Sequence, residues 1–276
     1  MLTYNNGSRM KLTPLILSLA AALAASTVQA DPLDHGDLVT FPTRAGVTQS
    51  LFVESPSPTP PWVIVLFPGV PGALHLDASG ATTLKGNFVV RSAHHWINWG
   101  DAVALVDTPS NKSGGVDDLF RLTKESFTDT QAVVATLRQR FPGAKIALVG
   151  TSSGTVSVGN ALQRDPAMAD AFVLTSPVTV SRRGGDTLAG LDVDGTKYRV
   201  LVVSNQGDEC PASPAYAARR LADHNHFGFV QVDSTGGRGN PSTQCGGHSP
   251  HGFLGIEPEV LGDIHGWLDG QPPQAK

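Results

Sequence analysis

One stretch of the chain, residues 145–155, constrains the fold and the chemistry more than any other. It carries a short apolar run, then the pattern G-x-S-x-G centred on Ser152, and then a run of small residues over 156–161. The apolar run is typical of a buried strand, and the small residues are typical of a helix. A serine at such a turn is exposed above the sheet edge, and the helix N-terminus directs amide N–H groups at a developing oxyanion.

Two glycines make this turn feasible. Gly150 and Gly154 lack the side chains that would collide where the strand and the helix nearly touch. The pattern by itself also fits an ordinary glycine- and serine-rich turn without chemistry. The strand before it and the helix after it favour Ser152 as a nucleophile.

The N-terminus has the pattern of a secretory signal peptide. Arg9 and Lys11 precede a mostly apolar run over 12–25, and the tripeptide Val-Gln-Ala at 28–30 resembles a cleavage site of the A-x-A type. We therefore expect residues 1–30 to be removed and the mature protein to be periplasmic or secreted. Translation from Met10 would still supply a complete signal.

The remaining residues, 31–276, are enough for one large domain with a full core. They contain no internal repeat and no linker after residue 61. No other stretch approaches 18 apolar residues, which argues against a membrane span. The net charge is −4, and without residues 1–30 the chain has 18 basic and 24 acidic side chains, a net charge of −6. This mildly acidic balance argues against nucleic acid or anionic membranes as partners. We expect a small-molecule substrate and no cofactor, and the oligomeric state stays open.

Apolar strand-like runs alternate with helix-like segments along the chain, after an N-terminal hairpin. This alternation predicts an α/β fold with a mostly parallel sheet and helices on both faces. The expected strands cover 38–41, 48–54, 62–67, 102–106, 145–149, 171–175, 198–203 and 227–232, and the expected helices cover 88–99, 125–141, 156–161, 214–224 and 256–268. Residues 176–197 show no strong helix.

In such a sheet the ligand site lies at the carboxyl ends of the strands, so an acid is sought there. Asp208 follows the run 198–203 in a polar turn, where it could orient an imidazole and stabilise its charged form. A solvated turn aspartate is the plain alternative. Asp107, at the end of an earlier strand, and Glu209 are rival acids.

A base is expected on the loop after the last strand. His248 and His251 are the histidines on that loop. We favour His251, because it is closer to the terminal helix and is followed by Gly-Phe, while His248 remains an alternative. For the oxyanion hole, the backbone N–H groups of Ser153 and Val70 are the expected donors. The turn that contains Val70 could also be an ordinary Pro/Gly turn.

Cys210 and Cys245 are the two cysteines of the chain. In an oxidising compartment an isolated pair is most simply a disulfide, which here would tie the acid loop to the base loop. Two unpaired buried thiols are the alternative. The spacing Cys245-x-x-His248-x-x-His251 could also suit a metal, but no fourth ligand is evident, so we expect no metal.

Together these residues resemble the α/β-hydrolase superfamily, and within it a poorly characterised group of bacterial secreted serine hydrolases. The order Ser152, Asp208, His251 is the chain order of that superfamily. The segments that carry the resemblance are 66–72, 84–88, 106–110, 150–155 and 249–257. The resemblance implies a Ser-His-Asp triad formed by these three residues.

Two departures stand out from the pattern that the resemblance implies. Ser153 stands where relatives of this group are expected to carry arginine, so any contact of a long cation is lost. Phe67-Pro68 stands where many hydrolases carry histidine before glycine, so the oxyanion loop cannot use that histidine's hydrogen bonds.

The sequence thus predicts a serine hydrolase that cleaves a carboxylic ester of a small or exposed substrate through an acyl-enzyme. Residues 176–197, where this fold usually carries its lid, are too few for a large helical cap, so we expect an open site with a minimal lid or none. A non-catalytic binding protein of the same fold, or a peptidase or amidase, are the alternatives. The substrate and the pathway stay open.

Overall fold

A computed structural model describes residues 1–3, 31–181 and 186–273 of the chain. The predicted signal peptide therefore lies outside the described residues, except for its first three. None of the described helices combines the length and the apolar character that crossing a membrane requires.

Within these ranges the strands form one eight-stranded sheet in the order β1-β2-β4-β3-β5-β6-β7-β8. The first two strands pair antiparallel, β2 also runs antiparallel to β4, and all other neighbours are parallel. The strands are β1 (Asp37–Arg44), β2 (Val47–Glu54), β3 (Trp62–Phe67), β4 (Ala102–Val106), β5 (Lys145–Thr151), β6 (Ala171–Thr175), β7 (Val200–Asn205) and β8 (Gly228–Val232).

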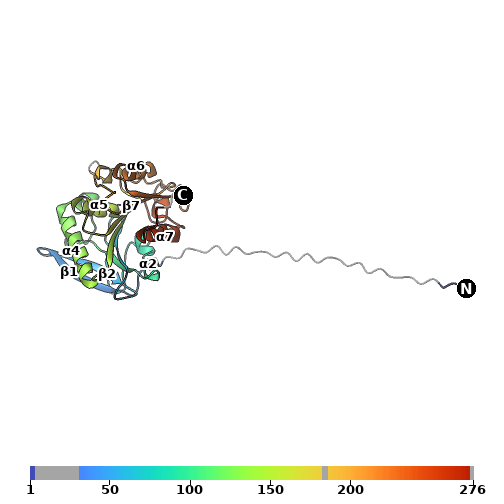
Figure 1. The fold of residues 1–276 in the computed structure, drawn as a ribbon, viewed down its shortest axis with the longest axis horizontal. Coiled ribbons are helices and arrows are strands. Elements are labelled where there is room, and N and C mark those ends of the chain that lie inside the picture. Colours follow the sequence, from blue (N-terminus) through green and yellow to red (C-terminus); the bar gives the residue numbers. More distant parts are fainter. Residues whose placement is uncertain (4–30, 182–185, 274–276) are drawn as a thin grey trace.

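Helices cover both faces of this sheet (Figure 1), because each central strand is apolar on both of its sides. On β3, Val63 and Val65 join the core under α4, α5 and α6, while Ile64 and Leu66 join the core under α1, α2 and α7. The helices are α1 (Phe88–Arg91), α2 (His94–Asn98), α3 (Asp118–Arg121), α4 (Lys124–Arg140), α5 (Gly154–Arg164), α6 (Ala215–Asn225) and α7 (Glu257–Leu268).

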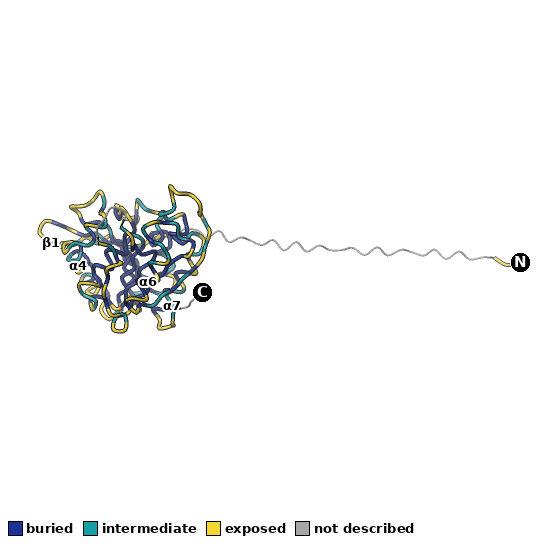
Figure 2. The backbone as a smooth tube through the Cα atoms, turned by 90° about the horizontal axis from the view of Figure 1, so that it is seen from above, coloured by how far each residue is buried: buried dark blue, intermediate teal, exposed yellow. Residues whose placement is uncertain are grey.

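Figure 2 shows buried backbone at the centre of the molecule and exposed segments around its outline. The prediction of a mostly parallel sheet with helices on both faces is confirmed. The minimal lid is confirmed as well, since the described residues between β6 and β7 form only the single 3₁₀ turn η2 (Leu188–Gly190).

The helix predicted over 88–99 is wrong in one respect, because the structure divides it into α1 and α2. The break lies at Ser92, whose hydroxyl donates to the carbonyl oxygen of Phe88 at 2.6 Å and whose φ of −111° leaves the helical region. A serine that bonds back to the preceding turn competes with the helix. The strand predicted over 198–203 begins later, at Val200, and ends at Asn205.

Candidate active site

The turn between β5 and α5 holds Ser152 in a strained backbone. Its φ is +52°, in the left-handed region that non-glycine residues rarely adopt. Its N–H donates to the carbonyl oxygen of Thr175 at 3.0 Å, and its own carbonyl accepts from Thr155 N at 2.9 Å. These bonds fix the serine at the carboxyl end of the central strand, as the sequence pattern predicts.

Glycine is required on both sides of this serine. A Cβ at Gly150 would lie 2.5 Å from the carbonyl oxygen of Gly154, and a Cβ at Gly154 would lie 2.0 Å from the carbonyl oxygen of Phe67. Both distances are too short for real contacts. The G-x-S-x-G pattern is therefore explained by the close approach of α5 to β5 and β3.

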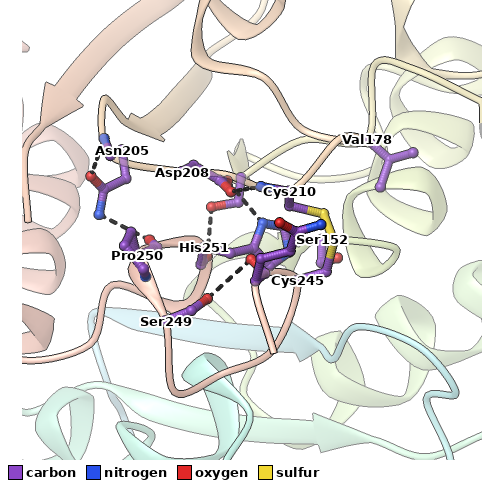
Figure 3. A network of polar contacts seen from close by, with 12 residues as sticks. Ser152, Val178, Asn205, Asp208, Cys210, Cys245, Ser249, Pro250 and His251 are labelled. Carbon is purple, nitrogen blue, oxygen red and sulfur yellow. Dashed lines mark hydrogen bonds and ion pairs between the residues drawn. A yellow bond between two sulfur atoms is a disulfide. The ribbon is translucent and has the colours of Figure 1, made fainter. Parts of the chain in front are cut away.

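Asp208 and His251 meet as the sequence predicts (Figure 3). Asp208 Oδ2 lies 2.8 Å from His251 Nδ1, and both side chains are almost fully buried. A carboxylate only accepts, so Nδ1 carries the proton and Nε2 keeps its lone pair. Within the ranges that the structure describes, Nε2 is buried and has no hydrogen-bond partner. A buried imidazole of this kind can accept a proton and be stabilised by the carboxylate behind it.

The acid loop after β7 is held by short local bonds. Asp208 Oδ1 accepts from Cys210 N at 2.8 Å, and Asp208 N donates to the carbonyl oxygen of Asn205 at 3.0 Å. The Asn205 amide also donates to the carbonyl oxygen of Pro250 at 2.9 Å. The residue that ends β7 thus orients the acid and contacts the loop of the base.

His251, the predicted base, lies in the 3₁₀ turn η3 (Pro250–Gly252). Its backbone carbonyl accepts from the hydroxyl of Ser176, which follows β6, at 2.8 Å. Sequence reasoning missed both Asn205 and Ser176. The rule that drew attention to Asp208 could have found them, because each is a polar residue at the carboxyl end of a strand.

The predicted disulfide between Cys210 and Cys245 is present. It joins the acid loop to the base loop, and Cys245 also lines the cavity described next. Two alternatives are thereby wrong. The thiols are not free, and Cys245 cannot serve as a metal ligand with His248 and His251.

A cavity of about 280 Å³ lies over the serine turn. Ser152 and His251 both line it, although no hydrogen bond joins them. Such bonds are often long in unliganded enzymes and tighten only when substrate is bound. The wall of the cavity also includes Val70, Asn87, Phe88 and His248.

Of the two predicted oxyanion donors, Val70 lines this cavity and Ser153 directly follows Ser152, which also lines it. Ser153 is buried at the N-terminus of α5, and Val70 is 61% exposed on the loop after β3. In the described part of the chain, neither backbone N–H donates to a protein acceptor. Two unused N–H groups at a helix N-terminus and an adjacent loop are suited to an oxyanion.

Asp107, one rival acid, has a structural role instead. Its carboxylate accepts from the N–H groups of Leu74 and Thr108 at 2.8 Å and of Leu76 at 2.9 Å. It therefore shapes the loop that carries Val70. Glu209, the other rival, accepts from Gly239 N at 2.8 Å and pairs with Arg238.

Arg121 supports the oxyanion loop from behind. Its guanidinium donates to the carbonyl oxygen of Pro68 at 3.2 Å and to the Ser157 hydroxyl at 2.9 Å. Burial lowers the pKa of Arg121 to about 10, while Asp118 and Asp117 oppose this shift. The side chain is therefore charged at neutral pH, although it is only 4% exposed.

His248, the alternative base, lies exposed at the cavity wall. Its ring packs against Gly86, where a Cβ would lie 2.4 Å from its Cε1. No carboxylate among the described residues pairs with it. The structure brings His251, and not His248, to Asp208.

One group of described side chains could hold a metal ion, namely Asp34, Glu54 and His94. None of the three lines the cavity.

No protein-family model matches the sequence, and no curated protein matches it either. Solved structures do match. XC6422 from Xanthomonas campestris, described as an α/β serine hydrolase without lid, is 16% identical with a TM-score of 0.55, and the match covers 88% of this chain and 100% of that chain. Est1E from Butyrivibrio proteoclasticus is 17% identical with a TM-score of 0.55, over 82% and 97% of the two chains. Est1E has also been determined with ferulic acid bound.

A peptidase also matches. Dipeptidyl peptidase 4 from Porphyromonas gingivalis is 14% identical with a TM-score of 0.52, but the match covers 83% of this chain and only 35% of that one. At such identities the likeness concerns the fold.

Proposed function

We propose that this chain, which has the α/β-hydrolase fold, is a serine hydrolase that cleaves carboxylic esters. One observation carries the proposal. His251 donates from Nδ1 to Asp208, its buried Nε2 has no partner among the described residues, and His251 and Ser152 line the same cavity. A nucleophile, a base and an acid that orients the base are thus assembled at one site.

In the first step the Ser152 hydroxyl oxygen attacks the ester carbonyl carbon, and its proton passes to His251 Nε2. The carbonyl electron pair moves onto oxygen, where the N–H groups of Ser153 and Val70 stabilise the charge. As the pair returns, the C–O bond to the alcohol breaks and His251 gives its proton to the leaving oxygen. The products are an alcohol and an acyl group on Ser152.

In the second step water takes the place of the alcohol. His251 removes a proton from the water as its oxygen attacks the acyl carbon. The tetrahedral intermediate collapses, the bond to Ser152 breaks, and the proton returns to the serine oxygen. The enzyme is regenerated and a carboxylic acid is released.

The shape of the site supports a small or exposed substrate. The cavity has about 280 Å³, close to the lower end of the usual range for ligand sites. Val70 and His248 are exposed at its wall. The likeness to a serine hydrolase described as without lid agrees with an open site.

We further propose that the protein acts in the periplasm or outside the cell. The signal-like N-terminus supports this location. The Cys210–Cys245 disulfide supports it as well, because such bonds persist in oxidising compartments. We propose removal of residues 1–30 and a domain at 31–276.

A panel of p-nitrophenyl esters and matched p-nitroanilides tests the reaction. We expect the wild type to hydrolyse short esters faster than anilides, and Ser152→Ala to reduce the rate by about 10⁴-fold or more. Ser79→Ala changes an exposed serine that does not line the cavity and should leave the rate unchanged. Faster anilide than ester cleavage would favour the peptidase that the likeness to dipeptidyl peptidase 4 suggests.

A further inference from the structure

Asn87 is placed to cap a helix but does not cap it. It is the residue before α1, a position where asparagine is favoured because its side-chain oxygen accepts from the first turn. Here no such bond forms. The backbone carbonyl of Asn87 instead accepts from Val90 N at 3.1 Å and Arg91 N at 2.9 Å.

The side-chain amide of Asn87 is therefore left over. Its Oδ1 is buried without a partner, and no acceptor among the described residues bonds its Nδ2. Buried polar groups in folded proteins are nearly always satisfied, so an unsatisfied one calls for a reason. The helix already has its backbone bonds, so Nδ2 is free to donate to a ligand, whereas the buried Oδ1 can only accept.

The amide lies beside the nucleophile. Asn87, Gly69 and Ser152 line the same cavity. A Cβ at Gly69 would lie 3.3 Å from Asn87 Nδ2 and 3.3 Å from Ser152 Cβ. Asn87 Nδ2 and Ser152 Cβ thus lie close to the same point above Gly69, so the amide is near the nucleophile.

An oxyanion forms in this neighbourhood. When Ser152 attacks a carbonyl, the charged oxygen is three covalent bonds away from Ser152 Cβ. We propose that Asn87 Nδ2 donates a hydrogen bond to this oxyanion, as a third donor beside the N–H groups of Ser153 and Val70. The inference rests on the proposed hydrolase function and names a further catalytic residue for it.

The segment that carries Asn87 is fixed to the loop of the base. Arg91 on α1 donates to the carbonyl oxygens of Gly86 at 2.7 Å and Gly252 at 2.6 Å, and to Glu257 at 2.6 Å. Donors held rigidly before the reaction stabilise a developing charge without reorganisation. The buried Arg91–Glu257 pair thus fixes the segment of Asn87 and the loop of His251 relative to each other.

Steady-state kinetics of Asn87 variants test the inference. Removing an oxyanion donor typically lowers kcat by about 10²- to 10³-fold. We expect a loss of this size for Asn87→Ala with little change in KM, because the bond strengthens only in the transition state. Lys85→Ala, an exposed change in the same segment, should retain wild-type kinetics.

The affinity for a boronic acid that carries the acyl group of the best ester gives a second measurement. This affinity would not change if Asn87 had only a structural role. The boronic acid forms a charged tetrahedral adduct on Ser152. Asn87→Ala should weaken its binding by about the same factor as kcat/KM. Thermal melting shows whether the variant is folded, and Asn87→Asp, which keeps the size but loses the donor, decides the question if the alanine variant does not fold.

Three outcomes are decisive. A raised KM with unchanged kcat would assign Asn87 to ground-state binding and overturn the inference. Wild-type kinetics in both folded variants would overturn it too, and in both cases the proposed function would stand. A wild-type protein that hydrolyses no ester and takes up no serine-directed label would overturn the proposed function, and this inference with it.

Discussion

Ser152 keeps a backbone conformation that a non-glycine residue adopts at a cost of about 1–3 kcal/mol. Its φ of +52° persists because the bonds to Thr175 and Thr155 fix the turn, and because glycines flank it on both sides. The strain places the serine at the wall of the cavity that His251 shares. Strain of this kind at a strand end is typical of a nucleophile.

The two histidines of the base loop are expected to differ strongly in importance. His251→Ala should reduce ester hydrolysis by about 10⁴-fold or more, because it removes the group that accepts the serine proton. His248→Ala should reduce it by at most about tenfold, since its ring lines the cavity without a carboxylate behind it. Comparing kcat/KM of the two variants checks this, and a larger loss for His248→Ala would exchange their roles.

For single residues, the sequence predicts those whose position follows from strand ends and chain order. It misses residues whose contacts depend on packing. Ser152, Asp208 and His251 follow from strand ends and chain order. Asn87 does not, because the local rule assigns an asparagine before a helix to capping. Only the folded chain shows that its amide lacks a partner and lies beside Ser152.

Among the elements, the acid and base loops form one unit. Neither contains regular structure beyond the turn η3, so their geometry depends on the Asn205 amide, the Ser176 hydroxyl and the disulfide. Their order in the sequence is predictable. The distance between the two loops in space cannot be predicted from the sequence. Glycine-rich loops have no single conformation until hydrogen bonds and side-chain contacts fix them.

The disulfide should stabilise this unit. It closes a loop with a sequence separation of 35, for which the chain-entropy model gives about 4 kcal/mol. We expect Cys210→Ser/Cys245→Ser to lower the free energy of unfolding by about this amount in urea titrations. The rate of ester hydrolysis should also be lower in this double variant, because the disulfide connects the loop of Asp208 to the loop of His251. Unchanged stability and activity in the double variant would contradict this role.

The carboxyl group of Asp101, the residue just before β4, is fully buried. Burial, with a smaller effect of Asp269, raises the pKa of the Asp101 carboxyl to about 7. His265 on α7 lies 3.4 Å from this carboxyl. The unfolded carboxyl loses its proton near pH 4, whereas the folded one retains its proton until about pH 7.

Folding therefore takes up a proton in this window, and the contribution of Asp101 to stability falls as the pH rises from about 4 to about 7. Asp101→Asn should remove this decline. The melting temperature of Asp101→Asn minus that of the wild type should therefore increase from pH 5 to pH 8. A difference that is constant across this range would show that the carboxyl titrates normally.

For the whole molecule, the fold is the most predictable property. The run over 62–67 is apolar at every position because helices cover both faces of β3. This pattern can be recognised from the sequence without knowledge of the tertiary structure. The split at Ser92 was missed, since a single hydroxyl bond ends a helix that its periodicity would continue. The signal peptide remains a prediction.

The open site predicts simple saturation on lipid-like esters. The described residues between β6 and β7 include no helix that could cover the cavity. The rate on tributyrin should therefore follow saturation and show no jump when the ester exceeds its solubility and forms droplets. A lidded lipase assayed in parallel supplies the control, and a jump like that of the lipase would contradict the absence of a closing element.

If His251 and Asp208 activate Ser152, this serine should react with a fluorophosphonate. The mature, oxidised protein would be labelled and its intact mass measured. We expect one adduct per chain, absent in Ser152→Ala and retained in Ser79→Ala. A folded protein that takes up no label, or a label that persists in Ser152→Ala, would show that Ser152 is not an activated nucleophile and would favour a binding protein with this fold.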